Sequence, residues 1–150
     1  MAEETKYLIE GPIDHSIISE RISNYGNNVK AGAHNIFIGQ VRDDMIDNKQ
    51  VKSIIYSSYA DMVEKEANLI IKEIIAKYSD VNLVDILHST GEVKTGENSL
   101  FVYVSSGHRI QVFEAIEETV ELIKKRFPVW KKEIFEDDSF HWPSNEDKPK

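Results

Sequence analysis

A predicted helix ends and a predicted strand begins within the sequence LIKKRFPVWKK, residues 122–132. Pro128 stops the helix, because it lacks an N–H donor and its ring clashes with the preceding turn. The segment carries five cationic side chains and no acid, in a chain whose formal net charge is −8. Such a cluster is unfavourable through self-repulsion unless an anion uses it. We therefore interpret it as part of a pocket for a phosphorylated or carboxylated small molecule, with a lysine available for chemistry.

The composition is that of one globular domain, and we expect residues 1–150 to form it. Hydrophobic residues make up 41% of the chain and charged residues 29%. No apolar stretch approaches the roughly 20 residues of a membrane span. The acidic start, MAEET, argues against a signal or transit peptide. We therefore expect a cytoplasmic protein without a membrane partner. The acidic total also argues against nucleic acid as the main partner.

Several classes of active site lack support in the sequence. The chain has no cysteine, so any sulfur chemistry requires sulfur that arrives on another molecule. Its five histidines are scattered, without the spacing of metal ligands. No glycine-rich phosphate loop and no GxSxG nucleophile motif occurs. We expect neither a metal nor a cofactor.

Apolar periodicity and turn residues predict helices at 14–25, 60–78 and 108–126, and strands at 7–9, 32–42, 51–59, 81–88, 100–104 and 130–135. The strand at 32–42 is expected to be buried and to pair with the strand at 51–59 across a polar loop. A turn is expected at 91–97, and a mobile polar tail from Glu136. The order β-α-β-β-α-β-β-α-β predicts an α+β fold with largely antiparallel sheets.

The last predicted helix has an apolar face and a polar start. The residues predicted to face inward are Val112, Phe113, Ile116, Val120 and Ile123. The sequence SSGHR, residues 105–109, joins the preceding strand to this helix. Free N–H groups and the positive helix dipole favour an anion there, and Arg109 adds a fork suited to phosphate. A capping turn with Ser105 or Ser106 as the cap explains the same residues equally well.

The cations of residues 122–132 also have an ordinary interpretation. Lys124, Lys125 and Arg126 complement the dipole at a helix C-terminus, as in many helices. Lys131 and Lys132 follow the proline, so this dipole does not explain them. A lysine that is partly buried among other cations becomes a competent acid, base or nucleophile. Arg42, at the end of an apolar strand, fits either a surface position or an anion clamp.

Four segments in order resemble one known family. They are FIGQVR at 37–42, YADMVEK at 59–65, SSGHR at 105–109 followed by FEA at 113–115, and KKRFPVWKKE at 124–133. Together they resemble the motifs of the catalytic, or large, subunit of molybdopterin synthase. The resemblance covers roughly residues 30–142.

This resemblance implies an α+β fold, an alpha/beta-hammerhead-like domain with an additional antiparallel sheet. It implies a central homodimer, each subunit of which binds a small ubiquitin-like sulfur carrier that ends in a Gly-Gly thiocarboxylate. The implied reaction is a sulfurtransferase step of molybdenum cofactor biosynthesis. Two sulfurs pass to cyclic pyranopterin monophosphate and form the dithiolene of molybdopterin. The absence of cysteine agrees with sulfur delivered by a partner.

The resemblance also implies roles for individual residues. Lys124 becomes the acid–base group and Lys131 stabilises charge, although the sequence is equally compatible with the reverse. The residues implied to bind or border the substrate are Phe37, Gln40, Val41, Arg42, His108, Arg109, Lys132 and Glu133. The chemistry agrees, because the reaction needs cations for the phosphate, a proton donor for the departing oxygen and charge stabilisation at the acyl carbon.

Some positions depart from the family pattern. Gln40 stands where members often have lysine, Ser57 replaces a usual glutamate, and HSTG at 88–91 replaces the more common HRxG. The family often supplies a tail arginine to the neighbouring subunit, whereas this tail offers only Lys148 and Lys150. A non-catalytic, dimeric anion-binding scaffold of the same fold is the alternative interpretation, and retention of Lys124 and Lys131 argues against it.

Overall fold

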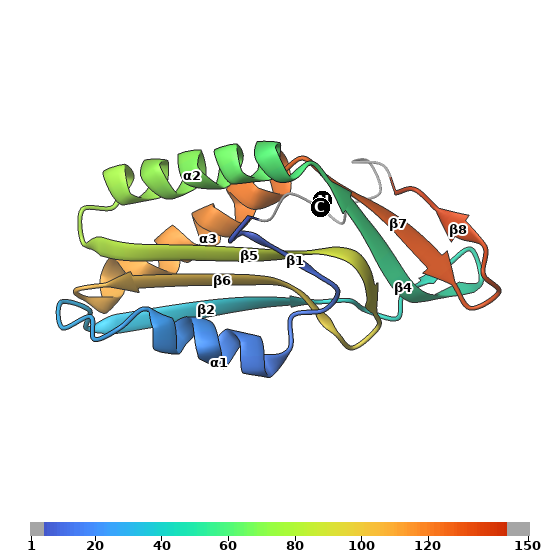
Figure 1. Cartoon of the computed structure of the whole chain (residues 1–150), viewed down its shortest axis with the longest axis horizontal. Helices are drawn as coiled ribbons and strands as arrows, with labels where there is room; N and C mark the ends of the chain where they lie inside the picture. Colours follow the sequence, from blue (N-terminus) through green and yellow to red (C-terminus); the bar gives the residue numbers. More distant parts are fainter. Residues whose placement is uncertain (1–4, 144–150) are drawn as a thin grey trace.

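The computed structural model describes residues 5–143, in which three helices and a sheet of eight strands pack together (Figure 1). The helices are α1 (His15–Asn24), α2 (Ala60–Lys77) and α3 (Arg109–Arg126). The strands are β1 (Leu8–Glu10), β2 (Ala33–Gln40), β3 (Met45–Ile46), β4 (Lys49–Ser58), β5 (Val81–Lys94), β6 (Asn98–Ser106), β7 (Val129–Phe135) and β8 (Phe140–His141). The sequence MAEE at residues 1–4, used above to argue against a signal peptide, lies outside the described residues.

The strands run in the order β2-β6-β5-β4-β7-β8, with β1 beside β5 and β3 beside β4. The β1–β5 pair is parallel, and the other pairs in the described chain are antiparallel. This confirms the prediction of an α+β fold with largely antiparallel pairing. Strands β4, β7 and β8 extend beyond the helices at one end of the molecule (Figure 1).

Helices cover both faces of the β2-β6-β5 part of the sheet. Helices α2 and α3 pack on one face, where their apolar stripes meet alternate residues of β5 and β6. The stripe of α2 consists of Val63, Ala67, Ile70 and Ile74, all at helical spacing and all buried. Helix α1 packs on the other face, over a second cluster that includes Ile18, Leu87 and Phe101. The packing therefore follows from the periods of the two element types, 3.6 residues in the helices and 2 in the strands.

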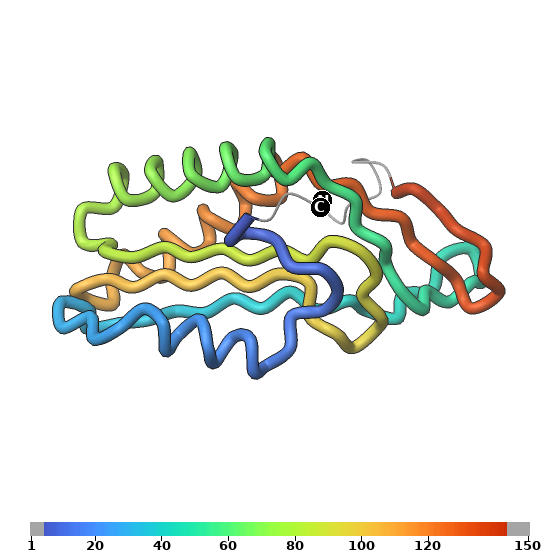
Figure 2. Tube along the Cα trace, viewed as in Figure 1, coloured from blue at the N-terminus to red at the C-terminus, as the bar shows by residue number. Residues whose placement is uncertain are grey.

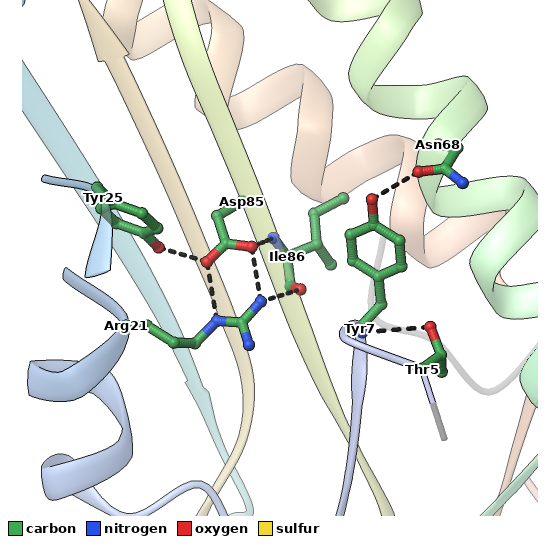
Figure 3. A network of polar contacts seen from close by, with 7 residues as sticks. All are labelled: Thr5, Tyr7, Arg21, Tyr25, Asn68, Asp85 and Ile86. Carbon is green, nitrogen blue, oxygen red and sulfur yellow. Dashed lines mark hydrogen bonds and ion pairs between the residues drawn. The ribbon is translucent and has the colours of Figure 1, made fainter. Parts of the chain in front are cut away.

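A polar cluster around Asp85 fixes α1 to the sheet (Figure 3). Nε and Nη2 of Arg21 donate to the two carboxylate oxygens of Asp85, at 2.8 and 2.7 Å. The hydroxyl of Tyr25 donates to the same carboxylate. Burial of the Tyr25 ring, together with this hydrogen bond, raises the pKa of the Tyr25 hydroxyl far above its ordinary value. The hydroxyl therefore remains a proton donor, and Asp85 remains fully hydrogen-bonded.

Four sequence predictions about individual elements are wrong. Strand β4 pairs with β5, β7 and β3, whereas β2 pairs with β6, so the predicted pairing of 32–42 with 51–59 does not form. As an edge strand, β2 leaves Ile36, Phe37 and Ile38 exposed rather than buried. The loop at 43–50 contains β3, which forms a hairpin with β4. Phe113 of α3 is 61% exposed, and the inward face of the helix is formed by Val112, Ala115, Ile116, Thr119 and Ile123.

Strand β5 is longer than predicted, because it continues through the expected turn at Gly91. Gly91 has a φ of +80°, a conformation that favours glycine. From Gly91 to Lys94, where the strand ends, β5 pairs with β4, and the path of the chain can be followed in Figure 2. Beyond β7 the chain turns back, and Phe140–His141 pairs with β7 as β8. Within residues 5–143, none of the helices is long and apolar enough to span a membrane.

Candidate functional site

Lys131 and Lys124 are connected through two aromatic side chains, Tyr56 and His88. Lys131 on β7 lies directly opposite Tyr56 on β4, so the two side chains leave the same face of the sheet with Cβ atoms about 5 Å apart. The Tyr56 ring packs edge-on against the His88 ring, with centroids 5.2 Å apart. The charge of Lys124 acts on His88 from the last turn of α3. The fold thus brings the end of α3 and the strands β4, β5 and β7 together in one cationic site.

The His88 imidazole within this site is neutral at physiological pH. The pKa of the ring is lowered to about 4, mainly by desolvation and to a smaller degree by the positive charge of Lys124. A hydrogen bond to the backbone oxygen of Ser89 opposes this shift without overcoming it. The site therefore combines two lysines with an uncharged histidine.

Strand alternation separates Lys131 from Lys132. Neighbouring residues on a strand point to opposite faces, so Lys131 and Glu133 share the Tyr56 face and Lys132 lies on the other. The Lys132 ammonium sits over the rings of Phe140 and Trp142, 4.7 and 5.8 Å from their centroids. Glu133 is buried. Burial of the Tyr56 ring is the main cause that raises the pKa of the Tyr56 hydroxyl, and the negative charge of Glu133 also raises it. Of residues 131–133, Lys132 is the one directed away from the two aromatic rings of the site.

Arg126 stabilises the packing of α3 on α2. Its Nε pairs with Glu66, and its Nη1 pairs with Glu73 at 2.5 Å, both on α2. These ion pairs use the charge of Arg126, whereas Lys125 beside it is exposed. The cationic cluster at the end of α3 is therefore divided between a structural arginine and Lys124, which faces the site.

The start of α3 already holds an anion, the side chain of Asp80. The backbone N–H of His108 donates to Asp80 Oδ2 at 2.6 Å, and His108 Nδ1 lies 3.2 Å from the same oxygen. The predicted cap does not form: His108 is the N-cap residue of α3 and makes no side-chain capping hydrogen bond, so neither Ser105 nor Ser106 is the cap. The hydroxyl of Ser106 instead donates to the His108 carbonyl.

Within one chain, His108 and Arg109 do not join the two lysines. Arg109 begins α3 and Lys124 lies in its last turn. At 1.5 Å per residue the two positions are about 22 Å apart along the helix axis. Both side chains are exposed, and Figure 1 shows the two ends of α3 at different ends of the central sheet.

Phe37 contributes to a separate groove that leads toward Lys124. A hollow of about 300 Å³ is lined by Phe37 of β2 and by Ile116, Glu117, Val120 and Glu121 of α3. Ile116, Val120 and Lys124 are spaced by four residues, so they follow one another along the same face of the helix. The groove is apolar at its base and acidic at its rim, and Lys124 lies one turn beyond it.

The remaining predicted residues lie at the end of β2 and directly after it. Gln40 is exposed and lies opposite Asn98. Val41 is buried, and its backbone bonds Glu97 and Gly96 at 3.0 and 2.8 Å, which ties it to the β5–β6 turn. Arg42 is largely exposed, and its Nη2 lies 3.3 Å from Asp44 Oδ2. Val41 therefore supports the end of β2, while Gln40 and Arg42 are open to solvent.

Two residues of the site were not predicted from the sequence, Tyr56 and His88. Each lies in a predicted strand, but its position beside a lysine depends on the pairing of β4 with β7 and on the extension of β5. Lys148 and Lys150, considered above as substitutes for a tail arginine, lie outside the described residues. Within residues 5–143, no group of three or more potential ligand side chains could hold a metal ion.

Residues 8–126 match a family model described as "MoaE protein". The chain is 36% identical over 140 residues to the molybdopterin synthase catalytic subunit of Pyrococcus abyssi, covering 93% of this chain and 92% of that protein. It is 34% identical to the Drosophila willistoni protein of that name, but spans only 37% of its length. Its fold resembles the crystal structure of molybdopterin synthase from Staphylococcus aureus, with a TM-score of 0.82 and 28% identity over 95% of this chain and 100% of that one. This likeness confirms the expected α+β fold, a hammerhead-like domain with additional antiparallel strands.

Proposed function

Because the chain belongs to the MoaE protein family, we propose that it is the catalytic subunit of a molybdopterin synthase. It would transfer sulfur from a thiocarboxylated, ubiquitin-like carrier to cyclic pyranopterin monophosphate. The observation that carries the proposal is the connection of Lys131 to Lys124 through Tyr56 and His88. Two cations that approach one site from different elements suit an anionic tail and a phosphorylated substrate.

The groove beside Phe37 is the proposed path of the carrier's tail. Its apolar base, formed by Phe37, Ile116 and Val120, leads along one face of α3 to Lys124. A Gly-Gly tail suits a shallow groove, since its backbone can approach closely without a Cβ clash. The acidic rim of Glu117 and Glu121 would repel the anionic terminus, while Lys124 and Lys131 attract it. The terminal thiocarboxylate is thereby directed to the lysines.

The proposed chemistry has two steps for each sulfur. The thiocarboxylate sulfur attacks a side-chain carbon of the substrate, so a C–S bond forms while a C–O bond breaks. Lys124 donates a proton to the departing oxygen. Water then attacks the acyl carbon of the thioester, whose C–S bond breaks; sulfur remains on the substrate as a thiolate, and the carrier leaves as a carboxylate. Lys131 stabilises the negative charge that develops on the acyl oxygen.

His108 and Arg109 join this chemistry in the proposal only from a second copy of the chain. They lie about 22 Å from Lys124 along α3, too far to share a phosphate group with it. We therefore propose a homodimer in which each site takes its lysines from one subunit and His108 and Arg109 from the other. Arg42, whose Asp44 pair is exposed and weak, supplies a further cation. Residues 1–150 act as one domain in this assembly.

A mixed dimer tests the shared site. One subunit carries Lys124→Ala and the other Arg109→Ala, each with its own affinity tag for purification. If sites are shared, one site holds both substitutions and the other is wild type, so the mixed dimer recovers about half of the wild-type activity. If each site lies within one subunit, both sites are damaged and activity is not recovered. A monomeric mass by light scattering would also contradict the shared site.

Reconstitution tests the function itself. The protein is mixed with a thiocarboxylated carrier and cyclic pyranopterin monophosphate, and the dithiolene product is measured by its characteristic oxidised, fluorescent derivative. Product that depends on both the protein and the thiocarboxylate supports the proposal. Absence of product, with carrier binding intact, supports the alternative of a non-catalytic anion-binding scaffold.

A further inference from the structure

We propose that the outer edge of β2 is the surface on which a second copy of the chain docks, with the two β2 strands antiparallel and a twofold axis beside Ile36. This inference rests on the proposed function, because it names the surface through which the proposed homodimer completes its two sites. In the described chain β2 lies at the end of the sheet and pairs with β6 alone. The backbone groups along its other edge therefore lack a strand partner.

The edge of β2 carries none of the features that prevent pairing with another chain. Sheet edges are commonly protected by lysines, by proline, by a bulge or by a covering segment. Strand β2, of sequence AHNIFIGQ, has no lysine, arginine or proline, and its one irregularity lies at its last two residues. The side chains at its centre, Ile36, Phe37 and Ile38, are 41, 36 and 42% exposed. An apolar and regular edge of this kind is expected to bind a further strand.

The regular part of β2 is symmetric about Ile36. The strand pairs with β6 in unbroken register from Ala33 to Gly39, and Ile36 is the middle residue of that stretch. Antiparallel pairing about this residue sets Ala33 opposite Gly39 of the second copy, and Ile36 opposite Ile36. A contact of this kind uses the same residues on both copies, so it closes as a dimer.

The second strand would cover apolar side chains on both faces of the sheet. Ile36 and Ile38 lie on the α1 face, since their partners on β6 belong to the cluster beneath that helix. Phe37 lies on the α3 face, in the groove that Ile116 and Val120 also line. Apolar neighbours across a strand pair stabilise the pairing. Both faces of the edge therefore favour the same partner strand.

The twofold axis also reverses α3, which separates its cations within one chain. Helix α3 and strand β2 start at the same end of the sheet, because β6, which leads into α3, ends opposite Ala33 (Figure 1). The midpoint between Arg109 and Lys124 is Ile116, about 11 Å from each along the helix. Ile36 lies about 10 Å along β2 from Ala33. An axis beside Ile36 therefore sets the start of one α3 level with the end of the other.

Charge favours this reversed orientation. The first turn of α3 contains no acid and carries Arg109. Glu117 and Glu121, at the rim of the groove, lie in the second half of the helix. In the reversed orientation the cationic start of each α3 is directed toward the acidic rim of the other copy, which is a complementary pairing. A second copy is therefore the occupant that both the strand edge and the adjoining helix fit.

Disulfide trapping tests the surface directly, because the chain has no cysteine of its own. Directly opposed residues of an antiparallel pair have Cα atoms about 4.5 to 5.5 Å apart, within the disulfide range of about 4.4 to 6.8 Å. Ile36→Cys should therefore give a reducible covalent dimer under mild oxidation. Ile38→Cys is the control for register, since the two copies of residue 38 would lie about 13 Å apart. Ile75→Cys on α2 has the same 41% exposure as Ile36 and is the control for random collision.

Neither control should cross-link. Trapping of either control as efficiently as Ile36→Cys, or no trapping of Ile36→Cys, would overturn the proposal. The same reaction is repeated with a carrier that lacks its two terminal glycines. If this carrier prevents trapping of Ile36→Cys, the edge belongs to the carrier and the proposal is overturned.

A charged variant provides a second measurement. Ile36→Lys places a charge on the edge, so it should be monomeric by light scattering while its circular dichroism stays that of the wild type. Ile75→Lys should remain a dimer, and an Ile36→Lys dimer would overturn the proposal.

Neither measurement requires the reaction. The expected trapping without sulfur transfer in the reconstituted system would contradict the proposed function alone. Sulfur transfer by a protein that fails the trapping test would contradict this inference alone.

Discussion

Tyr56 lies directly opposite Lys131 in the β4–β7 pair and packs edge-on against His88, with ring centroids 5.2 Å apart. Through this one tyrosine, Lys131 on β7 is connected to His88, on which the charge of Lys124 at the end of α3 acts. The same register directs Lys132 to the opposite face, over Phe140 and Trp142. The pairing of β7 with β4 therefore determines that Lys131, and not Lys132, lies beside Tyr56.

The depressed pKa of His88 predicts a pH dependence of stability. Its folded pKa of about 4 lies below the ordinary value of 6.5, so the unfolded chain binds the proton more tightly. His88 therefore contributes stability that is fully present above pH 6.5 and is lost as the pH falls toward 4. The loss should reach about 2 to 3 kcal/mol. Urea denaturation at several pH values measures it, and His88→Phe should show a correspondingly smaller loss.

The Asp85 cluster predicts a structural effect away from the site. Asp85→Ala leaves the Arg21 guanidinium and the Tyr25 hydroxyl without their partner (Figure 3). We expect the free energy of unfolding to fall by about 2 to 3 kcal/mol, since both groups are partly buried. Asp44→Ala is the matched control, because the Arg42–Asp44 pair is exposed and should cost less than about 0.5 kcal/mol. Equal effects in chemical denaturation would contradict the assignment.

Arg109 should act on the substrate phosphate and not on the carrier. Arg109→Ala should raise the apparent KM for the pterin by more than it weakens carrier binding. Arg109→Lys should recover only part of the loss, since a point charge lacks the planar fork of a guanidinium. Steady-state kinetics and carrier titration measure the two effects. Equal loss of carrier affinity in both variants would assign Arg109 to the protein interface instead.

The carrier's tail should be drawn in electrostatically. Carrier binding should weaken as salt rises, because the thiocarboxylate terminus meets two lysines. A carrier without its two terminal glycines should still bind through its globular part but support no sulfur transfer. Titration at low and high salt, with both carriers, checks this. Binding that does not respond to salt, or an active truncated carrier, would mean that the tail ends elsewhere.

Local patterns predicted the helices well. The stripe of Val63, Ala67, Ile70 and Ile74 is regular enough to define α2, and Pro128 defines the end of α3. The pairing partners of the strands were harder to predict from the sequence, because pairing depends on contacts between distant segments. Thus β4 was assigned the wrong neighbour, and the continuation of β5 past Gly91 was missed. The family assignment, which came from four motifs, is confirmed by the match over residues 8–126.

The site was predicted in part for the same reason. The cationic segment 122–132 stood out because its charge opposes that of the whole chain, and the family resemblance pointed to Lys124 and Lys131 within it. No sequence feature pointed to Tyr56 and His88, because their place in the site depends on strand register and on burial in the folded chain. The separation of Arg109 from Lys124 was readable from the sequence, as both lie in one predicted helix. The proposal that a second copy completes the site starts from this distance along the helix.

The most direct test of the central claim compares sulfur transfer by Lys124→Ala and Lys125→Ala. Both residues are exposed in the last turn of α3, so each loses a similar dipole interaction of about 0.3 to 1 kcal/mol and should keep the fold. Of these two lysines, Lys124 is the one whose charge acts on His88. We predict that Lys124→Ala lowers dithiolene formation by about a hundredfold or more while Lys125→Ala stays near wild type. Near-normal product from Lys124→Ala, or equal losses in both variants, would contradict the account.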